Sequence, residues 1–186
     1  GKPAQNQLAL VIGISAYRSW PPLTGAVAEA RKLARLLEQG GFTVTVITDP
    51  DSATLKAALS DFFRRAGSQE TSTSLLYYRG RAITVVDGDG VRNGVLLPVE
   101  APTEVGGRSA LIERQRDSGL WVRDLIADAE ALEKDRFLFL FDTGFSDDRL
   151  EVIKPVLRQP TATAGRAAYR AILAADGLDD DDEALS

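Results

Sequence analysis

LALVIGI, at residues 8–14, is a short and continuous apolar run near the start of the chain. A run of this length without polar alternation is typical of a β-strand that is buried on both faces. Strands of this kind occur in parallel sheets whose two faces are covered by helices. The run therefore predicts an α/β protein in which this strand lies inside the sheet.

Helix and strand patterns alternate after this first strand, which implies a mainly parallel sheet with helices on both faces. Each segment is identified by its hydrophobic period and by the capping or turn residues that bound it. The predicted elements are a helix at 25–39, a strand at 42–47, a helix capped by Ser52 that ends before Gly67, a strand at 74–78, a hairpin at 85–91, a helix at 120–133 capped by Ser118, a strand at 137–141, a short helix at 147–157 and a strand at 169–174.

The carboxyl ends of parallel strands are where functional groups gather in such sheets. Two segments follow buried strands at this edge, namely residues 79–82 and 142–147. The sequence therefore places the candidate functional site between these two segments. Residues 103–117 have weak periodicity and mixed charge, and they are predicted to form a surface loop.

Composition excludes several classes of function. The chain of 186 residues has a net charge of −5, which provides no cationic field for nucleic acid or for anionic membranes. The residues present suggest no cofactor and no metal site, and Asp87-Gly88-Asp89-Gly90 reads as a hairpin turn rather than a calcium loop. Because there are no cysteines and no long apolar run, we expect a cytoplasmic protein that does not span a membrane.

Several segments, in the same order along the chain, resemble the caspase-like superfamily (peptidase C14 type), and within it the bacterial metacaspase or orthocaspase branch. These segments are LVIGISAY at 10–17, LTGAVAEA at 23–30, GFTVTVITDP at 41–50, GVLLPV at 94–99 and FDTGFS at 141–146. The resemblance implies a three-layer caspase-like fold over residues 1–176, followed by an acidic tail or linker at 177–186. It also implies that the last strand and helices of the family's fold are missing from this chain.

The two catalytic positions of the family carry other residues here. Arg81 stands where the family's G-H-G motif has its histidine, and Gly144 stands where the family has its nucleophilic cysteine. A guanidinium has no lone pair with which to accept a proton, and glycine has no side chain. The chain contains no histidine or cysteine that could replace them. The resemblance therefore implies a catalytically inactive pseudo-orthocaspase with no catalytic residues.

Part of the family's substrate pocket is matched. Asp142 corresponds to the acidic residue two positions before the nucleophile, which in metacaspase-like members helps to bind a basic side chain. Uncharged Ser15 stands near a second acidic position of that pocket. We expect the Arg81 guanidinium to fill the vacated cleft and to pair with Asp142 or Asp147.

Three functions remain open on the sequence alone. The first is a non-catalytic scaffold or protein-interaction module of a larger bacterial protein, whose protein or peptide partner is a fused domain. The second is a pseudo-protease that binds a basic peptide side chain through Asp142 without cutting it. The third is a hydrolase that uses carboxylates such as Asp142 and Asp147. Trp20-Pro21-Pro22 is either an exposed aromatic loop near the cleft or part of the core.

Overall fold

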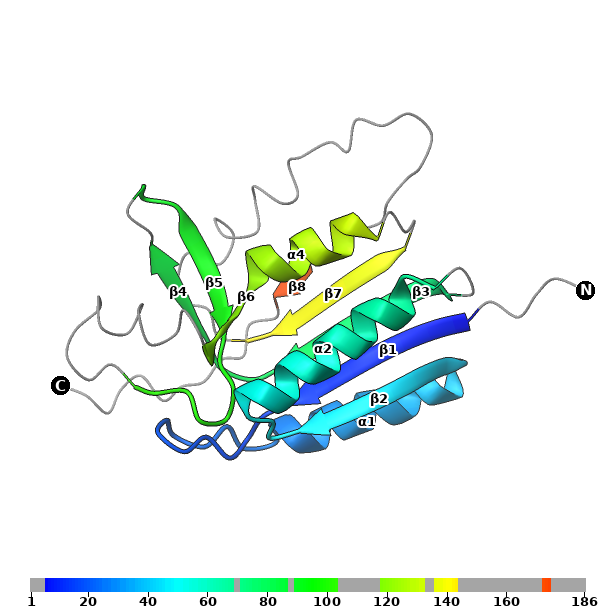
Figure 1. The fold of residues 1–186 in the computed structure, drawn as a ribbon. Coiled ribbons are helices and arrows are strands. Elements are labelled where there is room, and N and C mark those ends of the chain that lie inside the picture. The colour runs from blue at the N-terminus through cyan, green and yellow to red at the C-terminus, as the bar shows by residue number, and fades with distance from the viewer. Residues whose placement is uncertain are drawn as a thin grey trace, which may run out of the picture.

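The computed structural model describes residues 6–68, 71–86, 89–103, 118–132, 136–143 and 172–174. Its elements follow one another as strands, crossover helices and one hairpin (Figure 1). They are β1 (Asn6–Gly13), α1 (Ala26–Gln39), β2 (Phe42–Thr48), α2 (Ser52–Ala66), β3 (Thr71–Arg79), β4 (Ala82–Val86), β5 (Arg92–Leu96), β6 (Leu120–Trp121), α4 (Val122–Ala131), β7 (Phe137–Asp142) and β8 (Ile172–Ala174).

The main sheet has five strands in the order β2-β1-β3-β7-β8, and every neighbouring pair is parallel. Helix α1 covers one face of this sheet, while α2 and α4 lie on the other face (Figure 1). This is the three-layer α/β fold that the sequence predicts. A second, antiparallel sheet of β4, β5 and β6 lies beside the carboxyl end of the main sheet.

The first strand is central because its side chains are buried on both faces. Val11 packs with Ala30 and Ala34 of α1 on one face, while Leu10 and Ile12 belong to the larger core on the other. Small side chains on α1 allow the helix to approach the sheet closely. The larger core also contains an aromatic row in which the ring centroids of Phe137 and Phe139 are 4.8 Å apart.

Most of the predicted elements are confirmed within one to three residues at each end, and the hairpin is formed by β4 and β5. Trp20 is partly buried and packs against the core, while Pro21 and Pro22 are exposed, so the core interpretation holds for the tryptophan and not for the rest of the loop. The predicted helix at 147–157, the nucleophile position Gly144 and the tail at 177–186 lie outside the described residues. Strand 169–174 is described only over 172–174, as β8. None of the helices in the described ranges is long and apolar enough to cross a membrane.

Two helix starts differ from the sequence prediction. Asp51, not Ser52, is the N-cap of α2, because its carboxylate accepts the backbone N–H of Thr54 at 2.8 Å. The residues before α4 form strand β6, so Trp121 rather than Ser118 precedes the helix. Pairing of β6 with β5 outweighs the helical propensity of these residues, which is a tertiary effect that a local pattern does not contain.

The cap at Asp51 makes the stability of α2 depend on pH. Hydrogen bonds from Thr54 lower the pKa of Asp51 below its ordinary value of 3.8. A lowered pKa in the folded state adds stability above the unfolded pKa, and this stability is lost as the pH falls through the folded pKa. We expect Asp51→Ala to lower the urea midpoint at neutral pH, and the difference from the native protein to shrink below about pH 4.

Asp51→Asn is the matched control for this prediction. The amide oxygen can accept the same N–H but does not titrate in this range. The Asn variant should therefore stay close to the native protein at neutral pH and should differ from it in its pH dependence. An Asp51→Ala effect of equal size at neutral and acidic pH would show that the carboxylate charge is irrelevant to the cap.

Candidate functional site

The candidate site lies where β3 and β7 end, at the carboxyl edge of the main sheet. These strands are neighbours, and their register places Arg79 opposite Asp142. Parallel pairing therefore brings together the ends of the two segments that the sequence predicts as functional. The segment at 80–82 leads from β3 into β4, while Thr143, fully buried, follows β7.

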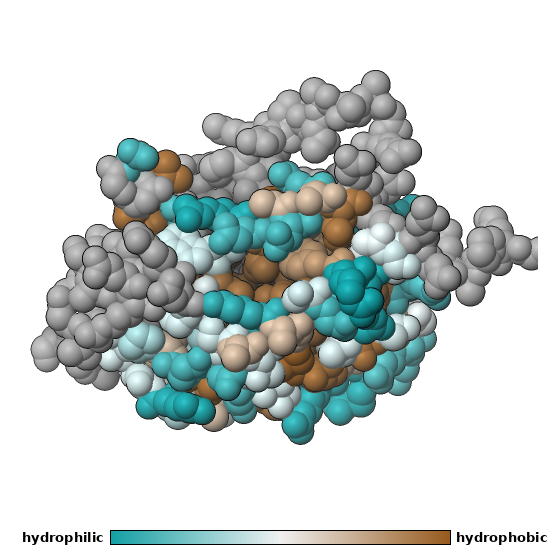
Figure 2. Space-filling model, in the orientation of Figure 1, coloured by the Kyte–Doolittle hydropathy of each residue, from teal (hydrophilic) through white to brown (hydrophobic). Residues whose placement is uncertain are grey.

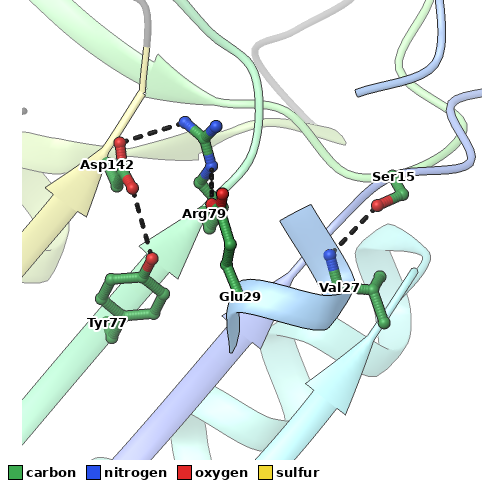
Figure 3. Close-up of polar contacts among 6 residues, drawn as sticks. All are labelled: Ser15, Val27, Glu29, Tyr77, Arg79 and Asp142. Atoms are coloured by element: carbon green, nitrogen blue, oxygen red, sulfur yellow. Dashed lines mark hydrogen bonds and ion pairs between the residues drawn. The ribbon is translucent and has the colours of Figure 1, made fainter. Parts of the chain in front are cut away.

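An ion-pair network links the ends of β3 and β7 to α1 (Figure 3). The Arg79 guanidinium donates from Nη1 to the Asp142 carboxylate at 3.0 Å and from Nε to the Glu29 carboxylate at 2.9 Å. Arg79 is only 13% exposed, Asp142 is 26% exposed and Glu29, in the first turn of α1, is 53% exposed. The arginine thus bridges two carboxylates from different elements, and its burial shields the Asp142 contact from solvent.

Tyr77 completes the environment of Asp142. Its hydroxyl donates to the second carboxylate oxygen at 3.3 Å, as Figure 3 shows. Burial raises the pKa of Tyr77 well above its ordinary value, and the neighbouring Asp142 charge raises it further. The phenol therefore stays protonated and acts as a hydrogen-bond donor rather than as a nucleophile. Both oxygens of Asp142 are engaged by side chains of the same chain.

The expectation that Arg81 pairs with Asp142 is wrong. Arg79 occupies that carboxylate, whereas the Arg81 Nε donates to the carbonyl oxygen of Pro21 at 3.0 Å. The Arg81 guanidinium also lies 5.9 Å from the centroid of the Tyr17 ring. The reason is where the strand ends: Arg79 is the last residue of β3 and shares a face with Tyr77, while Arg81 lies beyond Gly80 in the link to β4, where the alternation of β3 no longer applies. Asp147, the other expected partner, lies outside the described residues.

Two buried tyrosines hold the backbone at the position of Arg81. The Arg81 N–H donates to the Tyr17 hydroxyl at 2.6 Å, and the Tyr78 hydroxyl lies 2.8 Å from the Arg81 carbonyl oxygen. The two hydroxyls are 3.3 Å apart, and both also reach the Leu97 carbonyl oxygen, at 3.2 and 2.9 Å. Each hydroxyl has a single proton, so the donated bonds alternate among these acceptors. The network fixes the segment where the resemblance places the family's histidine.

Because Tyr17 and Tyr78 are buried, the stability that they contribute depends strongly on pH. Burial raises the pKa of Tyr17 to about 12, and it raises the pKa of Tyr78 well above 10. A raised pKa means that the stability is fully present below the unfolded value of 10 and is lost as the pH rises towards the folded value. We expect the phenolate absorbance of the buried tyrosines to rise together with the loss of far-ultraviolet circular dichroism, above about pH 10. Titration of Tyr17 and Tyr78 near the ordinary value, in a protein that stays folded, would contradict this network.

Ser15 has a structural contact. Its hydroxyl oxygen accepts the backbone N–H of Val27 at 3.1 Å, in the first turn of α1 (Figure 3). The backbone N–H groups of Ser15 and Ala16 in turn donate to the Asp49 carboxylate at 2.7 and 2.9 Å. Asp49 adopts a positive φ of 48°, which suits a short polar side chain at the end of β2. Ser15 therefore caps α1 from a distance, in place of the N-cap residue Gly25, which has no side chain to do so.

A separate groove lies between α2 and α4, on the face of the main sheet opposite to α1. It has a volume of about 600 Å³ and includes Leu59, Phe63 and Leu125 in its lining. Figure 2 shows brown, apolar side chains between the two helices. The lining of the groove does not include Asp142 or the side chains that bind it. It holds none of the residues that the sequence singles out.

Sequence reasoning missed Glu29, Tyr77 and the Tyr17–Tyr78 pair, and it included Arg79 only as the first residue of the segment at 79–82. Arg79 and Asp142 each stand at the last residue of a strand, so strand register would have paired them had the exact ends been known. The tyrosine pair had no local signal, because its members are 61 residues apart. No group of three or more His, Cys, Asp or Glu side chains in the described residues could hold a metal ion.

Comparison with known proteins agrees with this architecture. A family model described as the caspase domain, Peptidase C14, matches residues 6–165. The chain therefore belongs to the caspase domain family, whose catalytic cysteine is absent from it.

One solved structure that matches is the crystal structure of protein GSU0716 from Geobacter sulfurreducens. The TM-score is 0.58 at 14% identity, covering 90% of this chain and 71% of that chain. This likeness shows a shared fold. No curated protein matches the sequence.

Proposed function

We propose that this chain is a non-catalytic caspase-like domain that serves as a scaffold or protein-interaction module of a larger bacterial protein. The observation that supports the proposal is the environment of Arg81, the residue that the resemblance aligns with the family's histidine. Two tyrosine hydroxyls bind the backbone of Arg81, and its guanidinium is turned to Pro21. Nothing at that position can take a proton from a nucleophile, and the chain has no thiol to activate. We assign the chain to the metacaspase or orthocaspase branch on the motifs quoted above.

Recognition of a basic peptide side chain by Asp142 is the weaker alternative. The carboxylate already binds the guanidinium of Arg79 and the hydroxyl of Tyr77. A ligand cation would have to displace an arginine that is 13% exposed and that also pairs with Glu29. The same engagement argues against a hydrolase in which Asp142 is a general base, because both of its oxygens accept bonds from side-chain donors.

The test reintroduces the two lost groups and measures thiol reactivity. We compare the variant Gly144→Cys with the double variant Arg81→His, Gly144→Cys. An imidazole beside a thiol lowers its pKa and raises its thiolate fraction, which speeds alkylation near neutral pH. We expect the double variant to react with iodoacetamide at least about tenfold faster than the single variant at mildly acidic pH.

The double variant Thr84→His, Gly144→Cys is the control, because Thr84 lies in β4 and not at the predicted histidine position. It should react like the single variant. Equal rates for all three proteins would show that positions 81 and 144 do not face each other as a dyad. The assignment of lost catalytic residues would then be wrong.

A further inference from the structure

The outer edge of β2 lacks the features that usually prevent edge strands from associating. β2 is the end strand of the main sheet, and no strand of the described residues pairs with its outer side. Its sequence, FTVTVIT, has no charge, no proline and no glycine, and its register with β1 runs without a bulge. Natural proteins protect edge strands with lysine, proline, bulges or short length. This strand has seven residues and none of these protections.

Side chains along this strand leave its edge accessible. Thr43, Thr45 and Val46 are exposed, and Val46 is one of the few large apolar side chains in the described residues with more than a third of its surface in solvent, at 38%. Figure 1 shows β2 at the rim of the sheet with α1 on one face. The backbone groups on the outer side of β2, with which no strand of the described ranges pairs, can therefore accept a further strand.

We infer that β2 pairs antiparallel with β2 of a second copy of this chain, about a two-fold axis at Thr45. In this register Val44 lies opposite Val46 of the second copy, and Thr45 lies opposite its own equivalent. The pairs are β-branched, which favours cross-strand contact. Pairing seven residues adds roughly six to eight backbone hydrogen bonds. The inference is independent of the loss of catalysis.

Charges on α1 are complementary in the same arrangement. Glu29 reaches Arg79 on β3, so the opposite flank of α1 faces the β2 side of the sheet. That flank carries Arg31, Arg35 and Glu38, which are exposed and spaced by four and three residues. A two-fold axis at the sheet edge sets the two α1 helices side by side and antiparallel. The order of the three charges then brings Arg31 towards Glu38 of the second copy, and the same pair forms twice.

The pairing is weak and depends on concentration. One added strand contact and four charges make an interface at the small end of specific interfaces. The net charge of −5 on each copy opposes association, although physiological salt screens this repulsion beyond about 8 Å. We therefore expect a monomer–dimer equilibrium with a dissociation constant on the order of tens of micromolar.

Sedimentation equilibrium of the whole chain over a concentration series tests the inference. Val46→Lys should raise the dissociation constant at least about tenfold without changing the thermal midpoint, because a lysine on the edge is a known barrier to pairing. Val91→Lys is the matched control, since Val91 is 55% exposed next to β5 and should leave association unchanged.

Exchanging the charges of Arg31 and Glu38 tests the interface directly, because a variant that merely unfolds would not regain association when the second substitution is added. Glu38→Arg alone should weaken the dimer about tenfold, and adding Arg31→Glu to it should restore the native dissociation constant. A chain that is monomeric at every concentration would overturn the inference. A dimer that is insensitive to Val46→Lys, or that the charge exchange fails to restore, would also overturn it.

Discussion

Gly80→Ala is expected to lower the free energy of unfolding by about 3 kcal/mol, through overpacking and lost buried hydrogen bonds. A Cβ at this position would lie 2.6 Å from the Tyr78 hydroxyl oxygen and 2.8 Å from the Tyr17 hydroxyl oxygen. Both phenols are buried and bonded to the segment at Arg81, so neither can withdraw without losing its partners. A chain of this size should lose roughly 6–12 °C in its thermal midpoint.

Gly40→Ala is the control for this effect. Gly40 has a φ of −81°, and a Cβ there would meet its nearest atom, the Leu37 carbonyl oxygen, at 3.4 Å. The substitution should change the unfolding free energy by less than about 1 kcal/mol. If the Gly80 variant were as stable as the Gly40 variant, the tyrosine network would be too loose to fix the segment that carries Arg81.

Arg79→Ala is expected to cost about 2 kcal/mol, measured by urea unfolding at neutral pH. The substitution leaves Asp142, which is 26% exposed, with Tyr77 as its remaining donor of the two described above. Removing one partner of a shielded pair leaves the other charge poorly compensated, and this penalty exceeds the value of an exposed pair. The loss of unfolding free energy therefore measures how much the Arg79–Asp142 ion pair stabilises the ends of β3 and β7.

Arg64→Ala is the control that shows whether burial or contact distance decides how much an ion pair stabilises the fold. Arg64 lies 2.6 Å from Asp61, closer than Arg79 lies to Asp142, but the two side chains are 72% and 53% exposed. An exposed pair contributes little, so this variant should lose less than about 0.5 kcal/mol. Equal losses for Arg79→Ala and Arg64→Ala would show that the Arg79 network is no more than a surface contact.

The layers of the fold were predictable because they follow from local patterns. The apolar run at 8–14 predicts a central strand, and the alternation after it predicts crossover helices. The two segments predicted to follow buried strands, around Arg81 and Asp142, do meet at the same edge of the sheet. Helix starts were less predictable, because β6 forms only through its pairing with β5 and so has no signal of its own.

The contacts inside the site could not be predicted from spacing. Arg79 and Arg81 are two residues apart, and which of them reaches Asp142 depends on the last residue of β3. The Tyr17–Tyr78 pair joins a loop after β1 to a strand 61 residues later, and the cap of α1 comes from Ser15, twelve residues before Val27. Such contacts are decided by three-dimensional packing, which a single sequence does not display.

Hydrolysis of fluorogenic peptides by the unaltered domain tests the proposed loss of catalysis. Peptides that end in arginine, lysine or aspartate are incubated with the purified chain, and the release of fluorophore is compared with buffer. Because the chain has no cysteine and no histidine, and the resemblance places an arginine where the family has its base, we predict rates equal to the buffer rate for all three peptides. Turnover that rises with protein concentration and disappears in Asp142→Ala would contradict the proposal.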